Sequence, residues 1–208
     1  MSMKRTLGAI LMLAVVSACG TTTQSSRNAV PTYLTTELPA AHTEVGAAPT
    51  SLAIKGIEVT VPQALTTSEA NVFVPIADIV WRGDPMGDRR QQVAAIFEDA
   101  AAGATSGLTQ GQGVILSLEV TRFHGLTEKA RYMTGGNYAM HFLMTLRDAE
   151  TGILLMRPRP IVADIKCAGG MRAIADDNAG RTEKVVVSER LISVLQAELT
   201  NLVLLPTL

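Results

Sequence analysis

The sequence has few of the residues that build metal sites. Its 208 residues include two cysteines and three histidines, and His42, His124 and His141 have no close spacing with a cysteine or carboxylate. Because protein metal sites need several such ligands at short spacing, we expect no metal and no other cofactor. Only His124 and His141 could meet as a ligand pair, if the chain between them folds back as a hairpin.

Catalytic motifs are missing as well. Residues 103–107 read Gly-Ala-Thr-Ser-Gly, whereas the G-x-S-x-G elbow of serine hydrolases needs serine at the position of Thr105. Residues 111–113, Gly-Gln-Gly, lack the further glycines and the following helix of a phosphate-binding loop. We therefore predict no catalytic residues and a protein that is not an enzyme.

The charge of the chain gives no sign of a nucleic acid partner. The whole chain has 18 basic and 19 acidic side chains, and residues 1–18 contain two of the basic ones, Lys4 and Arg5. Without those residues, 16 basic side chains remain against 19 acidic ones, a net charge near −3. With no basic block and one tryptophan, the sequence is unlike that of a nucleic-acid-binding protein.

The N-terminus has the pattern of a secretory signal. Lys4 and Arg5 precede an apolar or small-residue run over residues 7–16, and small residues then lead to Cys19. A transmembrane anchor would need about 20 apolar residues, so this run is too short to span a bilayer. We predict that residues 1–18 are a signal peptide.

The tetrapeptide Val16-Ser17-Ala18-Cys19 resembles the lipobox of bacterial lipoprotein precursors. The resemblance implies that Cys19 receives a diacylglyceryl group, and that a third acyl chain joins its amine after cleavage. Several acyl chains hold a protein firmly, at about 0.8 kcal/mol per buried CH₂. Gly20, in place of the Asp that retains lipoproteins in the inner membrane, implies an outer-membrane anchor with the protein facing the periplasm.

The part of the chain after Cys19 predicts a flexible tether over residues 19–50. It contains eight threonines and three scattered prolines, and it shows no apolar period. As a coil it would reach roughly 30 Å. Acylation of Cys19 would leave Cys167 without a partner in the chain, and we interpret Cys167 as a small buried hydrophobic residue.

Residues 51–208 predict one domain that contains both strands and helices. Alternating apolar residues predict strands over 57–61, 114–121 and 138–146, a bulge at Gly56, and a tight hairpin turn at Gly135-Gly136. Residues 76–81 and the run from Ile153 are further strand candidates. Pro158 and Pro160 place the run from Ile153 at a sheet edge.

Two amphipathic helices complete this domain. Asp88 can cap the first helix, which ends near Gly103 and Gly107, and Thr182 can cap the second, which ends before Pro206. The order of elements predicts a two-layer α+β fold. We expect an antiparallel sheet of about four to five strands with both helices on one face.

The segment from Arg122 to Tyr132 is the best candidate for a contact surface. It combines charged and aromatic or apolar residues within eleven positions, which suits a protein interface. The candidate residues are Arg122, Phe123, His124, Glu128, Lys129, Arg131 and Tyr132. The competing interpretation is a solvated hairpin whose charges pair locally. Trp81 is either a core anchor or a further partner-binding residue.

The order of elements resembles that of small outer-membrane lipoproteins, such as the lipopolysaccharide-assembly lipoprotein and accessory lipoproteins of lipid-trafficking ABC transporters. A closer resemblance, over residues 50–204, is to an uncharacterised lipoprotein family of alphaproteobacteria. It rests on residues 77–85, 122–132 and 146–148. This resemblance implies a lipoprotein but no activity and no catalytic residues.

These patterns favour a non-enzymatic envelope lipoprotein, an accessory or assembly factor that contacts other envelope proteins. The alternative is a periplasmic carrier or binder of a lipid or small apolar ligand. For that role Met140, Phe142, Met144 and the leucine-rich last helix would line an apolar cleft. The competing interpretation of these residues is a plain core, and the sequence does not identify a ligand.

The lipid anchor can be tested by intact-mass measurement of the membrane-extracted protein. We expect a chain that begins at Cys19 and carries added acyl mass, because the lipobox directs both cleavage and acylation. The Cys19→Ala variant should lack that mass. An unacylated wild-type chain, or one that retains residues 1–18, would contradict the prediction.

Overall fold

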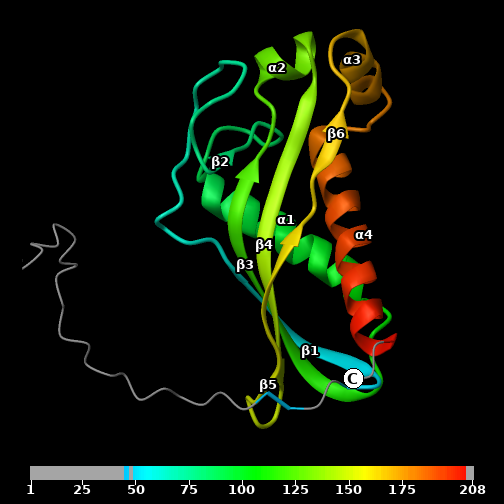
Figure 1. The fold of residues 1–208 in the computed structure, drawn as a ribbon. Helices are drawn as coiled ribbons and strands as arrows, with labels where there is room; N and C mark the ends of the chain where they lie inside the picture. The colour runs from blue at the N-terminus through cyan, green and yellow to red at the C-terminus, as the bar shows by residue number, and fades with distance from the viewer. Residues whose placement is uncertain (1–44, 47–48, 205–208) are drawn as a thin grey trace, which may run out of the picture. The chain divides into compact units, whose positions relative to one another are not determined.

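The computed structural model describes residues 45–46 and 49–204. The predicted signal peptide, Cys19 and most of the predicted tether lie outside these residues. Along the chain the elements are β1 (Leu52–Thr60), β2 (Ile79–Val80), α1 (Arg89–Thr105), β3 (Gln112–His124), α2 (Glu128–Met133), β4 (Gly136–Asp148), β5 (Leu154–Val162), β6 (Ile165–Cys167), α3 (Met171–Asn178) and α4 (Glu183–Leu204) (Figure 1).

The sheet is mixed, which corrects the prediction of an antiparallel sheet of four to five strands. It has six strands in the described part of the chain, with the main order β1-β3-β4-β5, and β2 and β6 pair with β3 and β4. β4 is antiparallel to β3, β5 and β6, whereas β1 and β2 are parallel to β3. Two parallel neighbouring strands cannot be joined by a tight hairpin and need a crossover connection. The chain between β1 and β3 contains α1, which provides such a crossover.

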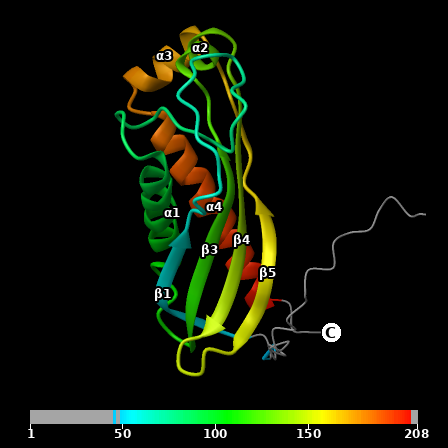
Figure 2. The ribbon, with the colours of Figure 1, turned by 90° about the vertical axis from the view of Figure 1, so that its left-hand side faces the viewer.

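The α+β class is confirmed, and α1 and α4 lie together on one face of the sheet (Figure 2). Both helices begin as the sequence predicts. The Asp88 side chain accepts hydrogen bonds from the backbone N–H groups of Arg90 and Gln91, and the Val185 N–H donates to Thr182 Oγ1 at 3.5 Å. The short helices α2 and α3 were not predicted.

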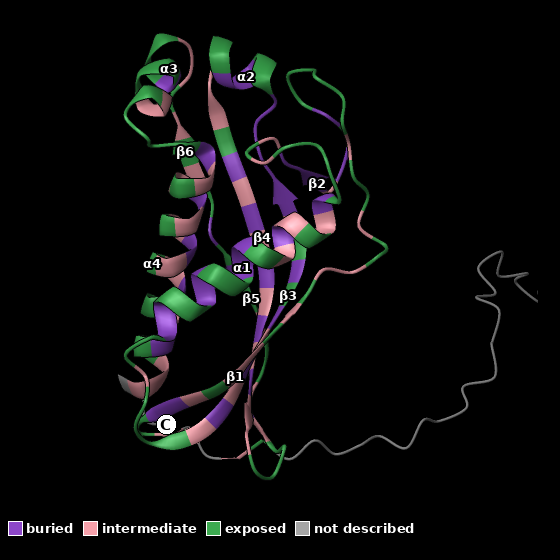
Figure 3. Cartoon of the chain, turned by 180° about the vertical axis from the view of Figure 1, so that it is seen from behind, coloured by how far each residue is buried: buried purple, intermediate pink, exposed green. Residues whose placement is uncertain are grey.

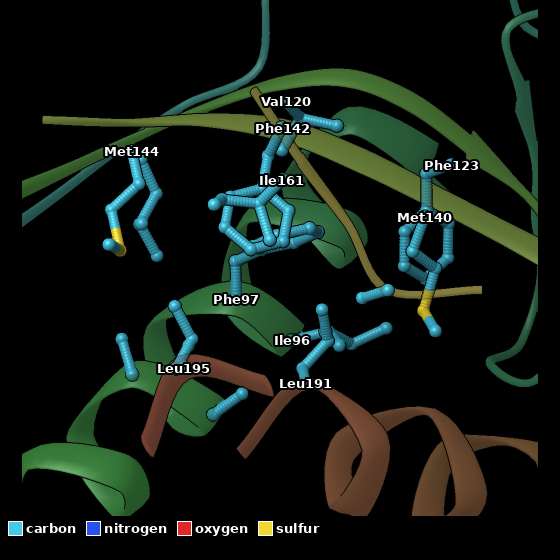
Figure 4. Close-up of a cluster of buried hydrophobic side chains, with 14 of the residues drawn as sticks. Ile96, Phe97, Val120, Phe123, Met140, Phe142, Met144, Ile161, Leu191 and Leu195 are labelled. Atoms are coloured by element: carbon cyan, nitrogen blue, oxygen red, sulfur yellow. The ribbon is translucent and has the colours of Figure 1, made fainter. Parts of the chain in front are cut away.

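The core lies between the sheet and these two helices, and it is built from the alternating apolar residues of β3 and β4 (Figure 4). The Phe97 ring of α1 meets Phe142 and Phe123 edge to face, with ring centroids 5.3 and 6.0 Å apart. Each such pair adds about 0.5–1.5 kcal/mol beyond the burial of its surface. Figure 3 shows the resulting division of α4, with buried residues on one side and exposed residues on the other.

Two local predictions about the strands are confirmed. The β1–β3 register shifts between Ile54 and Gly56, which places a bulge at Gly56. Pro158 and Pro160 belong to β5, which lies at the end of the strand order. An edge strand tolerates proline because proline has no N–H to donate to a neighbouring strand.

The tight hairpin turn predicted at Gly135-Gly136 is wrong, because α2 lies between β3 and β4. Gly135 and Gly169 instead allow two backbone segments to cross closely. A Cβ built on Gly169 would lie 1.9 Å from the Gly135 backbone nitrogen, and one on Gly135 would lie 2.5 Å from the Cys167 carbonyl oxygen. Gly135 also has a φ of 70°, a conformation that glycine adopts readily.

We expect Gly169→Ala to lower the free energy of unfolding by about 1–3 kcal/mol, because the added methyl group must push the two segments apart. Urea denaturation followed by circular dichroism measures this loss. Gly107→Ala is the matched control, because a Cβ there has no neighbouring atom within 4 Å. Equal stability of the two variants would show that the backbones do not cross so closely.

Candidate functional site

The strongest candidate site lies at the end of the sheet where α2 and α3 are found (Figure 1). We call this region the tip and define it as residues 71–76, α2, and residues 168–174. Hydrogen bonds join its segments. Thr127 Oγ1 donates to the Val72 carbonyl oxygen at 2.7 Å, and the Gly170 N–H donates to the Arg131 carbonyl oxygen at 3.0 Å.

Two of the residues proposed from sequence for partner binding lie in the core beneath the tip. Trp81 and Phe123 have 0% and 1% of their surface exposed, and their rings meet at a centroid distance of 5.4 Å. The Trp81 indole donates to Asp84 Oδ2 at 2.8 Å. These two aromatic residues therefore support the tip from inside and do not face a partner.

The two histidines of the domain have separate partners. His124 Nε2 lies 3.0 Å from the Pro75 carbonyl oxygen, and His141 Nε2 lies 3.0 Å from Asp164 Oδ1. Within residues 45–46 and 49–204, no group of three or more histidine, cysteine, aspartate or glutamate side chains lies close enough to hold a metal ion.

Arg131, a predicted surface charge, is buried at the centre of an ionic network. Its guanidinium lies 2.6 Å from Asp177 Oδ1 and 3.7 Å from Glu183 Oε1. The Tyr138 hydroxyl donates to the Glu183 carboxylate. The network thus joins α2, β4, the end of α3 and the start of α4.

Burial shifts the ionisation of the groups in this network. Burial raises the pKa of Glu183 above its ordinary value, although the Tyr138 hydrogen bond and the Arg131 charge act against that shift. Burial and the nearby Glu183 also raise the pKa of Tyr138. Burial lowers the pKa of Arg131, but the hydrogen bond to Asp177 and the nearby negative charges outweigh it, so this guanidinium remains charged.

Other ion pairs fix the long loop before α1. Arg89 Nε lies 2.7 Å from Glu69 Oε1, and the hydrogen bond from Arg89 lowers the pKa of that carboxyl. Lys184 Nζ lies 2.9 Å from Asp84 Oδ1 and so ties the loop to α4. The chain that leads into and out of residues 71–76 is therefore held at several points.

The tip exposes an unusual number of large apolar side chains. Eight of the thirteen exposed large hydrophobic residues in the described part of the chain lie there: Val72, Phe73, Val74, Ile76, Tyr132, Met133, Met171 and Ile174. Soluble proteins rarely gather exposed apolar residues on one region unless it binds something. Only Tyr132 of this set was proposed from sequence. The short apolar run at 72–76 was the available signal for the others in that loop.

A groove of about 260 Å³ lies between residues 73–74 and the segment that leads from β3 through α2 to β4. Phe73, Val74, Leu126 and Ala130 give its lining an apolar character, and Arg122 adds a cation. The groove therefore brings Arg122 and His124, two of the residues proposed from sequence, together with the exposed loop.

A second pocket of about 290 Å³ lies beside the Arg131 network. Its lining includes Arg82, Glu128, Arg131, Asp177 and Glu183. Arg82 Nε lies 3.8 Å from Glu128 Oε2, and Arg131 is paired as described above. The cations of this pocket are thus paired with its carboxylates, whereas the groove is lined, among the described residues, by Arg122 and by no carboxylate.

The apolar cleft that a lipid carrier would need is filled with packed side chains. Met140, Phe142 and Met144 have at most 1% of their surface exposed, and they pack toward Leu191 and Leu195 of α4 (Figure 4). These residues are the core of the domain. These residues therefore do not line an open cleft, which the hypothesis of a lipid carrier requires.

Cys167 lies in β6, partly buried. Burial raises the pKa of its thiol, which keeps the thiol protonated and poorly reactive. No helix in residues 49–204 is both long and apolar enough to cross a membrane.

These features define a small α+β domain whose tip segments are held together by hydrogen bonds and ion pairs. The chain belongs to a family of unknown function, DUF6778, whose family model matches residues 52–205. No curated protein matches the chain.

Several solved structures are similar at low sequence identity. A Xanthomonas campestris protein of the DUF330 family is 11% identical, covers 75% of this chain and 90% of its own, and has a TM-score of 0.43. The PelC dodecamer of Paraburkholderia phytofirmans is 13% identical, with 76% and 90% covered and a TM-score of 0.33. A candidate lipoprotein of Caulobacter crescentus is 15% identical, with 69% and 90% covered and a TM-score of 0.30.

The raised pKa of Glu183 predicts a pH-dependent effect of Glu183→Gln on stability. In wild type the Glu183 carboxyl group binds its proton more tightly in the folded state than in the unfolded state. The contribution of Glu183 to stability is therefore lost as the pH rises from 4.5, its ordinary pKa, through its raised pKa in the folded state. Glutamine does not titrate. The free energy of unfolding of the variant relative to wild type should therefore rise as the pH increases from 4.5 through the raised folded pKa of Glu183.

Urea denaturation at steps of pH measures this difference. Glu189→Gln, on the same helix, is the control, because Glu189 is 54% exposed and its ion partner among the described residues is Arg181 at 3.0 Å. A pH-independent difference between wild type and Glu183→Gln would contradict the prediction.

Proposed function

We propose that this protein is a non-enzymatic lipoprotein of the bacterial envelope that contacts another envelope protein through its tip. The observation that carries the proposal is the gathering of eight exposed apolar side chains on three segments of the tip. Interfaces between proteins are enriched in aromatic residues and methionine, and Phe73, Tyr132, Met133 and Met171 are of these types.

The route of the chain supports this role. Val45 pairs with Leu154, and the Gly46 N–H donates to the Leu154 carbonyl oxygen at 2.8 Å. Leu154 begins β5, whereas the tip lies at the opposite end of β4, which has 13 residues and so is about 43 Å long at 3.3 Å per residue. A tether from Cys19 would therefore join the domain at the end away from the tip.

The location proposed for this lipoprotein is the outer membrane, facing the periplasm. Support comes from the signal pattern, the lipobox at Cys19 and the glycine that follows it. A protein anchored in this way needs no membrane-spanning helix. An accessory or assembly role fits a domain that offers a contact surface without a catalytic arrangement.

Photo-crosslinking in cells tests the contact. A photoreactive residue at Met133 or at Met171, each introduced into the full chain, should form an adduct with another envelope protein, because both side chains are exposed at the tip. Val162 is the control position, because it is 59% exposed but lies on β5, outside the tip.

A second substitution makes this test specific. Met133→Glu should reduce the adduct formed from position 171 by about tenfold, since a carboxylate in an apolar contact is costly to bury. Val162→Glu should leave that adduct unchanged. Absence of any protein adduct from the tip, or equal adducts from Val162, would refute the proposed contact.

A further inference from the structure

The groove beside Phe73 is held open by its surroundings. Hydrogen bonds fix the loop on both sides of residues 73–74, because the Lys129 N–H donates to Asn71 Oδ1 at 2.9 Å and His124 Nε2 lies 3.0 Å from the Pro75 carbonyl oxygen. Gly125, Gly135 and Gly136 contribute only backbone to its lining. A groove that is already fixed in this way loses little conformational entropy when a partner binds.

Positive charge borders this groove. Lys129 Nζ lies 4.8 Å from the centroid of the Phe73 ring, and Arg122 lines the groove directly. Neither cation forms an ion pair within the residues that the structure describes. None of the described residues that line the groove is a carboxylate. The groove thus offers apolar surface together with two cations that have no ion partner within 4 Å among the described residues.

The size of the groove limits what it can hold. Its volume is about 260 Å³, below the roughly 300–1,000 Å³ of sites for whole small molecules. An acyl chain of a lipid would need a longer apolar space. One or two side chains of a partner protein fit this volume.

We propose that this groove binds a segment of another envelope protein in which an apolar side chain stands next to an aspartate or glutamate. The apolar side chain occupies the space between Phe73, Leu126 and Ala130, and the carboxylate pairs with Lys129 or Arg122. This inference rests on the proposed function and adds the chemistry of the partner. Complementary charge at the edge of an interface selects the partner and speeds its association.

The test places a photoreactive residue at Val74, which lines the groove and is 74% exposed, in the full membrane-anchored chain. Mass spectrometry then identifies the peptide attached to it. We expect a peptide of a different envelope protein with an acidic residue within two positions of the attachment site.

Charge variants test the role of the cations. Lys129→Glu and Arg122→Glu should each lower the yield of the Val74 adduct about fivefold, while Lys129→Arg should retain it, because arginine keeps the charge. Arg157→Glu is the matched control, since Arg157 is an exposed residue of the part of β5 that pairs with residues 144–146 of β4, whereas residues 136–137 of β4 line the groove. Thermal unfolding by circular dichroism should show that all four variants remain folded.

Several outcomes would overturn the inference. They are an attached peptide without a nearby carboxylate, a lipid adduct, a peptide of this same chain, no adduct at Val74, or a yield unaffected by either charge reversal. If Met133 and Met171 still crosslink to another protein, the proposed function stands and only the chemistry of the groove is wrong. If none of the three positions forms a protein adduct, the proposed function fails as well.

Discussion

The tip depends on one buried cation. Arg131 draws Asp177 and Glu183 to a single point, and through them it connects α2 with the end of α3 and the start of α4. Removing one partner of a buried pair typically costs 3–5 kcal/mol, because the charge left behind has no compensation. The loop at 71–76 rests in turn on the segment that carries Arg131, since Thr127 and Lys129 hold it there. Ion pairs and hydrogen bonds therefore hold the segments of the tip that carry the exposed apolar side chains.

The two halves of the domain are stabilised in different ways. Around Phe97 and Phe142, apolar side chains fill the space between the sheet and the helices, and this packing is not directional. At the tip, ion pairs and hydrogen bonds to backbone oxygens hold short helices and loops whose own apolar residues are exposed. Such polar contacts fix positions closely, which suits a surface that must be recognised.

Sequence patterns predicted the elements that have a long and regular period. The alternation of β3 and β4, the Asp88 cap and the leucines of α4 follow from local rules, and so does the edge position of β5 with its prolines. The partner of β1 could not be predicted in this way, because periodicity does not specify which strand lies alongside. Helices of six and eight residues, as in α2 and α3, show too little period to be recognised.

The candidate site was predicted only in part, for a related reason. The segment 122–132 was identified from its mixed composition, and the structure brings Arg122, His124 and Lys129 to the groove or its border. Some residues of that segment are buried, however, and others are exposed. Which of them are buried depends on contacts with residues far away in the chain. Arg131 meets Asp177, 46 positions later, and His124 meets Pro75, 49 positions earlier. No local pattern contains such pairs.

The prolines of β5 have a consequence for the membrane-anchored protein that we propose. Molecules confined to a surface meet one another far more often than molecules in solution, and an open sheet edge would then invite strand-to-strand pairing. Pro158 and Pro160 deny an incoming strand two of the N–H groups it would need. Crowded copies of the proposed lipoprotein would thus be hindered from pairing through their β5 edges.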